Sequence, residues 1–110
     1  MRQVLLDELS RSDVDKVHEY LKSHAIPSSL AGLYWVELAA DRLDPDQYGA
    51  GSDRPFRFAV EVGDSWARFE LLVRSRDNLR SPHTRYANRE QRRFILDFTE
   101  RLITNLGLKT

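Results

Sequence analysis

Apolar positions in the first third of the chain recur with the spacing of one helix face. They are Val14, Val17, His18, Leu21 and Ala25. This 3.6-residue periodicity predicts an amphipathic helix. Ser12 could precede its first turn, and Ser10 with Asp13 offers an alternative S-x-x-D start. Pro27 predicts that the helix ends near Ala25, because the residue before a proline avoids helical geometry.

A second stripe near the end of the chain predicts a longer helix. Its apolar positions are Phe94, Ile95, Phe98, Leu102 and Leu106. Asn88 with Gln91 three residues later is typical of an N-cap and its partner. Gly107 suits the position just after the last helical residue. We therefore expect a helix from about Arg89 to Leu106.

The central part of the chain alternates between apolar and polar residues, which predicts strands. LYWVEL, residues 33–38, is rich in aromatic and branched side chains and predicts one strand. FRFAVEVGDSWARFELLVRS, residues 56–75, predicts a hairpin with a type II′ turn at Gly63-Asp64. Pairing outward from that turn gives an apolar face made by Val62–Ser65, Val60–Ala67, Phe58–Phe69 and Phe56–Leu71. The other face then holds Glu61–Trp66, Ala59–Arg68 and Arg57–Glu70.

These elements predict one α+β domain over residues 1–110, which is a suitable length for one hydrophobic core. The expected order is α-β-β-β-α: a helix, a three-stranded antiparallel meander and a second helix, with both helices on one face of the sheet. The pattern assigns no element to residues 1–10. Residues 39–55 are rich in Gly, Pro and Asp and predict a long loop with at most one helical turn.

The alternation places both tryptophans of the chain on the sheet face opposite the helices. The predicted members of this face that could contact a partner are Leu33, Trp35, Arg57, Trp66, Arg68 and Leu72. One reading is that the long loop or residues 1–10 fold over this face. The other is that it is an interface, since exposed aromatic residues interleaved with arginine are typical of interface centres. Three glutamates against two arginines on this face argue against nucleic acid there.

Positive charge is concentrated in one stretch, although the chain has 17 basic and 17 acidic residues. Residues 74–93 contain seven arginines and two acidic residues. Arg85, Arg89, Arg92 and Arg93 could bind an anion at the start of the second helix, where the helix dipole disfavours cations that lack a partner. The alternative is pairing with acidic residues of the chain itself. The candidates are Asp13, Asp15, Glu19, Asp41, Asp44 and Asp46.

The expected order of one helix, three strands and one helix resembles that of double-stranded RNA-binding domains. Such domains open their second helix with a lysine-rich motif, whereas this chain has NREQRR, residues 88–93, at the comparable place. The resemblance implies nucleic acid as an alternative ligand for the arginine segment, and no functional residue is carried over from it.

Patterns for catalysis and metal binding are weak. His18 and His24 are six residues apart and cannot chelate one metal as an i, i+4 pair would. His83 is a candidate base in a cleft formed by the 39–55 loop, but no acid or nucleophile accompanies it in sequence. We expect no metal and no cofactor, and a binding protein in preference to an enzyme.

The chain contains no cysteine, which excludes thiolate chemistry and fits a reducing cytoplasm. Its longest apolar runs are too short for a membrane span or a signal peptide. The sequence thus predicts a small cytoplasmic interaction protein that binds itself, as a homodimer, or another protein through the open sheet face. The alternatives are an anion-binding module for nucleic acid or an acidic peptide, and an enzyme using His83.

Overall fold

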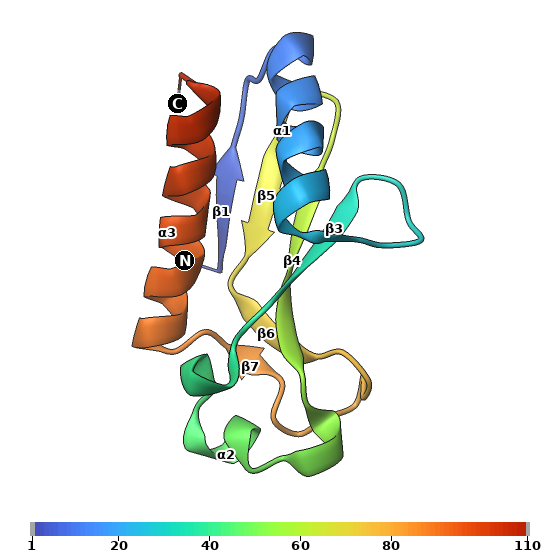
Figure 1. Cartoon of the computed structure of the whole chain (residues 1–110), viewed down its shortest axis with the longest axis vertical. Coiled ribbons are helices and arrows are strands. Elements are labelled where there is room, and N and C mark those ends of the chain that lie inside the picture. Colours follow the sequence, from blue (N-terminus) through green and yellow to red (C-terminus); the bar gives the residue numbers. More distant parts are fainter. Residues whose placement is uncertain (1, 110) are drawn as a thin grey trace.

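The computed structural model describes residues 2–109 and has an α+β fold, in which two long helices pack on a sheet (Figure 1). Along the chain the elements are β1 (Gln3–Leu6), α1 (Arg11–His24), β2 (Ile26–Pro27), β3 (Leu33–Glu37), η1 (Ala40–Arg42), α2 (Pro45–Tyr48), η2 (Gly51–Asp53), β4 (Phe56–Val62), β5 (Ala67–Glu70), β6 (Leu72–Ser75), β7 (Arg85–Tyr86) and α3 (Arg89–Leu106).

Both long helices end where the sequence predicts, and α3 also begins there, whereas Ser12, the first candidate start of α1, lies inside that helix. Ser10, the alternative start, is the N-cap of α1 and accepts a hydrogen bond from the amide of Asp13. Asn88 caps α3 in a reciprocal capping box with Gln91. Gly107 follows α3 in the left-handed region, at φ 64°.

The α+β class is confirmed, but the predicted three-stranded meander is incomplete. Within residues 2–109 the sheet has seven strands. β3, β4 and β5 form the antiparallel meander that the pattern predicts. β1, from the unassigned first ten residues, pairs antiparallel with β5 and extends that edge of the sheet. The short strands β2 and β7 pair with β3 and β6.

The predicted hairpin register is wrong by two residues. Val62 pairs with Ala67 and Val60 with Phe69, so the chain reverses at Asp64-Ser65 and not at Gly63-Asp64. Gly63 closes the turn by donating its amide to the carbonyl of Trp66. A shift of two residues keeps every side chain on its predicted face, because side-chain direction repeats every second residue.

The second half of the hairpin is also divided. The expected continuous strand over residues 65–75 is β5 followed by β6, and Arg57 of β4 pairs with Arg74 of β6 instead of with Glu70. The alternation continues across the break, since Leu71 and Val73 are buried while Leu72 and Arg74 are half-buried.

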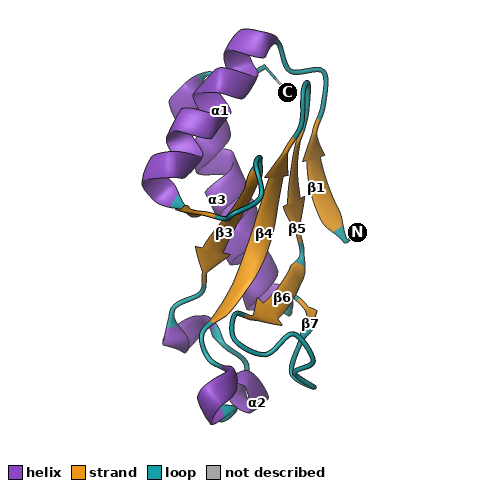
Figure 2. Ribbon diagram, turned by 90° about the vertical axis from the view of Figure 1, so that its right-hand side faces the viewer, coloured by secondary structure: helices purple, strands orange, loops and turns teal. Residues whose placement is uncertain are grey.

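α1 and α3 cover the same face of the sheet, as predicted (Figure 2). From α3, Phe98 makes edge-on ring contacts with Phe58 and Phe69, at centroid distances of 5.9 and 6.4 Å. From α1, Val17 and Leu21 are fully buried in the same core. Edge-to-face rings at such distances are a favourable aromatic geometry. The apolar face of the sheet is therefore occupied by the protein's own helices.

Residues 39–55 form an ordered lobe built from η1, α2 and η2, where the sequence predicts a long loop with at most one helical turn. Figure 1 shows this lobe at the end of the sheet where α3 begins. Asp44 and Gln47 form a capping box around α2, and Gln47 is completely buried. In the described part of the chain, no helix is long and apolar enough to cross a membrane.

Candidate interaction face

The six residues predicted for the interface lie together on the sheet face opposite α1 and α3, which we call the open face. Each of them is half-buried. The registers place Leu33 beside Glu61, Trp35 beside Ala59, and Glu61 beside Arg68. Trp66 lies opposite Gly63 at the turn of the hairpin. Its ring packs so closely on Gly63 that a Cβ atom at this glycine would overlap the indole. The open face is thus a contiguous surface of several strands.

Each tryptophan of the open face is stacked against an arginine. The guanidinium of Arg57 lies 3.7 Å from the ring centroid of Trp35, and that of Arg68 lies 5.4 Å from Trp66. Both distances fall within the range of cation–π attraction. Stacking holds the long arginine side chains flat on the sheet, so less side-chain entropy remains to be lost when a partner binds.

The charge of the open face is balanced, which corrects the expected excess of glutamate. Arg74 and Arg76 also reach this face, so on β3 to β6 and the two residues after β6 four arginines stand against Glu37, Glu61, Glu70 and Asp77. At the β1 edge, Arg2 over the Tyr86 ring and Asp7 beside Trp66 add one charge of each sign. Three of the arginines are in ion pairs: Arg68 with Glu61, Arg74 with Glu70 at 2.8 Å, and Arg76 with Asp77 at 2.9 Å and Glu37 at 3.5 Å.

Arg57 differs from its neighbours. Within residues 2–109 it forms no ion pair, whereas its Nε is buried without a hydrogen-bond partner just as the Nε of Arg74 is. Burial lowers the pKa of the Arg57 guanidinium, and the positive charges of Arg76 and Arg74 lower it as well, while Glu37 and Asp77 act in the opposite direction. Because arginine stays protonated at neutral pH in proteins, Arg57 carries its charge in a position without an ion-paired carboxylate.

Neither of the two segments that could have covered the tryptophans folds over them, although β1 borders Trp66. β1 adds to the edge of the sheet, and its Gln3 and Leu5 flank Trp66 in a shallow recess of about 220 Å³. The lobe of residues 39–55 packs at the sheet's end against the start of α3 (Figure 1). Trp35 and Trp66 consequently remain partly exposed to solvent.

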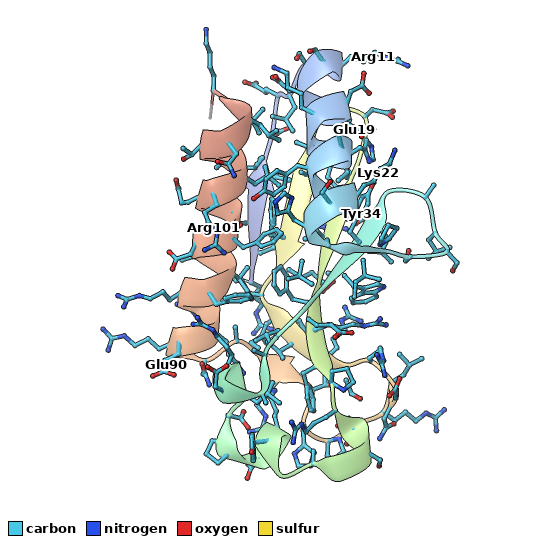
Figure 3. All side chains as sticks on the ribbon, viewed as in Figure 1. Arg11, Glu19, Lys22, Tyr34, Glu90 and Arg101 are labelled. Atoms are coloured by element: carbon cyan, nitrogen blue, oxygen red, sulfur yellow. The ribbon has the colours of Figure 1, made fainter. Side chains whose placement is uncertain are left out.

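The arginine segment 74–93 does not form one site. Arg74 and Arg76 belong to the open face. Arg85 lies 3.5 Å from carboxylate oxygens of both Asp44 and Asp46, so the predicted pairing with loop acids holds for this residue. The acids of α1 take no part: Glu19 pairs with Lys22 at 3.2 Å, far along the molecule from Glu90 at the start of α3 (Figure 3).

The other three arginines of the predicted anion site are exposed at the start of α3. Within the described residues, Arg89, Arg92 and Arg93 form no ion pair, and Arg89 and Arg93 line a surface recess of about 240 Å³ together with Glu90. Arg85 is already engaged by two carboxylates, and Glu90 adds negative charge to the recess. Anion binding here stays a prediction.

His83 is half-buried, and its Nδ1 lacks a hydrogen-bond partner. The recess formed by the 39–55 lobe, about 380 Å³, is lined by Leu38, Ala40, Leu43, Gly51, Arg54 and Pro55, so His83 does not face it. His18 donates to or accepts from the hydroxyl of Tyr34 at 2.7 Å, which supports its interpretation as a residue at the edge of the core. Within residues 2–109, no group of three or more potential metal ligands occurs.

Sequence reasoning missed several members of the open face. Leu5, Ile26 and Tyr86 are 49%, 49% and 47% exposed, and their partners in the sheet are Arg68, Trp35 and Leu72. Arg74 could have been found by continuing the alternation of Arg68 and Leu72. Leu5 could have been found from the short apolar run at residues 4–6, had it been interpreted as an edge strand.

No protein-family model, curated protein or solved structure matches this chain.

Proposed function

We propose that this protein is an interaction module that self-associates through its open face. The observation that carries the proposal is the pair of partly exposed tryptophans, each stacked on an arginine, on the sheet face opposite both long helices. Tryptophan and arginine are the residues that most often contribute large shares of binding energy at interface centres.

The balance of charge favours a second copy as the partner. In a twofold dimer the same surface meets itself, so a face with a strong net charge would repel its own copy. The open face instead carries four arginines and four acids on β3 to β6 and the two residues after β6, and Arg2 and Asp7 at its β1 edge add one charge of each sign. Nucleic acid requires an excess of positive charge, which this face lacks.

The surface also contains enough apolar material to drive association. Leu5, Ile26 and Tyr86 are about half exposed, around a centre formed by Trp35 and Leu33. Burial of apolar surface contributes about 25 cal/mol per Å², and a stable contact covers about 800 Å² per partner. By area, a face that spans several strands can supply such a contact.

The proposal is tested by measuring mass with light scattering across protein concentrations from about 1 to about 200 μM, a range that detects moderate affinities. We expect the mass to rise from 12.8 kDa toward twice that value. Trp35→Arg should keep the mass at the monomer value, because it replaces a central aromatic side chain with a fifth positive charge. Arg101→Glu, on the exposed surface of α3, is the matched control and should associate as the wild type does.

A further inference from the structure

The unpaired Arg57 indicates what the second copy contributes. Its three neighbouring arginines on the open face each have a carboxylate within the described chain. Arg57 is held over Trp35 by stacking, with its Nε buried and without a partner. A half-buried guanidinium that has no carboxylate partner is unfavourable, so a carboxylate supplied by a second copy to its terminal amino groups would stabilise it.

The register of β3 and β4 shows where such a carboxylate could come from. Three cross-strand rows face the open side: Leu33 with Glu61, Trp35 with Ala59, and Glu37 with Arg57. Glu37 is 34% exposed at its side chain, and its contact with Arg76 is a long one at 3.5 Å. Arg57 and Glu37 therefore lie on either side of the line between β3 and β4. Arg57 has no ion pair, and Glu37 has only the long contact with Arg76.

A twofold axis along that line would pair these two residues reciprocally. This axis lies midway between the two sheets and runs parallel to the strands. A rotation by 180° about it places β3 of one copy opposite β4 of the other. Each Arg57 then lies opposite the Glu37 of the other copy, and the two Trp35 rings meet close to the axis. Strands of the two sheets remain nearly parallel or antiparallel, as in aligned sheet packing, where sheets are about 10 Å apart.

The same axis places the rest of the face in a compatible arrangement. Because the strand order is β5-β4-β3-β2, β2 of one copy lies opposite β5 of the other. Ile26 of β2, which is 49% exposed, would then be covered by the strand that contains Arg68 and Glu70. Its apolar surface would pack on the aliphatic stems of those side chains.

Resting on the proposed self-association, we propose that two copies pack face to face about a twofold axis between β3 and β4, and that Glu37 of each copy accepts hydrogen bonds from Arg57 of the other. Two such bonds form per dimer, because a twofold contact repeats every interaction. Arg57 and Glu37 then determine the partner's identity, and Trp35 supplies apolar contact at the axis.

Charge exchange tests this geometry with sedimentation velocity. Arg57→Glu places two carboxylates opposite each other, and Glu37→Arg places two guanidinium groups opposite each other. Each variant alone should weaken dimerisation by about 10- to 100-fold or more. An equimolar mixture of the two should dimerise again, because both contacts of the mixed dimer pair opposite charges. The double variant Arg57→Glu/Glu37→Arg should recover in the same way.

Folding is monitored by thermal unfolding of each variant. If a reversal does not fold, the neutral variants Arg57→Gln and Glu37→Gln replace it, with weakening expected from each one. Recovery in the mixture supports the axis, since a merely structural role of either residue predicts no recovery. Two outcomes overturn this geometry while leaving self-association in place. In one, both reversal variants dimerise as strongly as the wild type. In the other, each reversal weakens dimerisation but the equimolar mixture does not dimerise again. A wild-type protein that stays monomeric overturns both.

Discussion

Gln47 and Gln91, which are both completely buried, share a hydrogen bond of 2.8 Å from the Nε2 of Gln91 to the Oε1 of Gln47. Each glutamine is also the third helical residue of a capping box, around α2 and α3 respectively. Gln91 Nε2 donates further to the carbonyl of Arg42, and Gln47 Nε2 to that of His83. One amide pair therefore joins the 39–55 lobe to the start of α3 and to residue 83.

Removing one member of this pair should destabilise the protein. Gln91→Ala removes the donor to the Arg42 carbonyl, leaves the Gln47 amide oxygen with only the Asp44 backbone amide at 3.3 Å, and breaks the capping box of α3. We expect a loss of about 2–4 kcal/mol in the free energy of unfolding, measured by urea denaturation. Glu100→Ala, at an exposed position on α3, should change it by less than about 0.5 kcal/mol. Equal values for the two variants would contradict the structural role of the pair.

Alanine substitutions at two glycines distinguish the stability lost through a left-handed backbone from the stability lost through crowding of the new Cβ atom. Gly51 has φ 60° and open space around a Cβ atom, whereas Gly32 has φ 79° and a Cβ there would lie 2.7 Å from the Val62 carbonyl oxygen. Gly51→Ala should cost about 1–2 kcal/mol from the left-handed conformation alone. Gly32→Ala should cost more, by about 1–3 kcal/mol, because the crowded atom is backbone. Chemical denaturation of both variants measures the difference, and an equal cost would be the contrary result.

Asp53 should make stability depend on pH in the acid range. Its carboxylate accepts hydrogen bonds from the hydroxyl of Ser81 at 2.6 Å and the amide of Asn78 at 2.9 Å, and these bonds lower the pKa of Asp53 below its ordinary value of 3.8. A lowered folded-state pKa contributes stability above the ordinary pKa and loses it as the pH falls below that value.

The corresponding experiment compares the wild type with Asp53→Asn between about pH 6 and pH 2. The wild type should be the more stable protein near neutral pH, and the difference should shrink below about pH 4 as Asp53 becomes protonated. Asp41→Asn, at an exposed position, serves as the control. A difference that stays constant over the whole range would show that the hydrogen bonds do not depend on the charge of Asp53.

The helices, the faces of the sheet and the central meander could be predicted from the sequence, whereas the hairpin register and the additional strands could not. Helical periodicity and capping residues located α1 and α3, because both signals are local. Alternation assigned Trp35 and Trp66 to the side away from the helices, but it cannot distinguish a register from one shifted by two residues. Gly63 misled the choice of turn: it accommodates the Trp66 ring, which would have to shift if a Cβ atom were present there.

The composition of the candidate face was predicted only in part, for a similar reason. Arg74 and Arg76 looked like members of a basic segment, yet their positions on β6 and after it bring them beside Arg57 and Glu37. Ile26 and Leu5 come from short edge strands that are defined by their partners and not by a pattern of their own. The pairing of Gln47 with Gln91 required the tertiary fold, although both D-x-x-Q and N-x-x-Q are capping signals.

Tryptophan emission on dilution tests the self-association of the open face most directly, because both tryptophans of the chain lie there and report on no other surface. If two copies associate through this face, dilution from about 200 to about 1 μM shifts the tryptophan emission to longer wavelength and increases its quenching by acrylamide, because the indoles become accessible. The contrary result is a measured mass that changes over this range while emission and quenching stay the same. It would place the interface on another surface and contradict association through the open face.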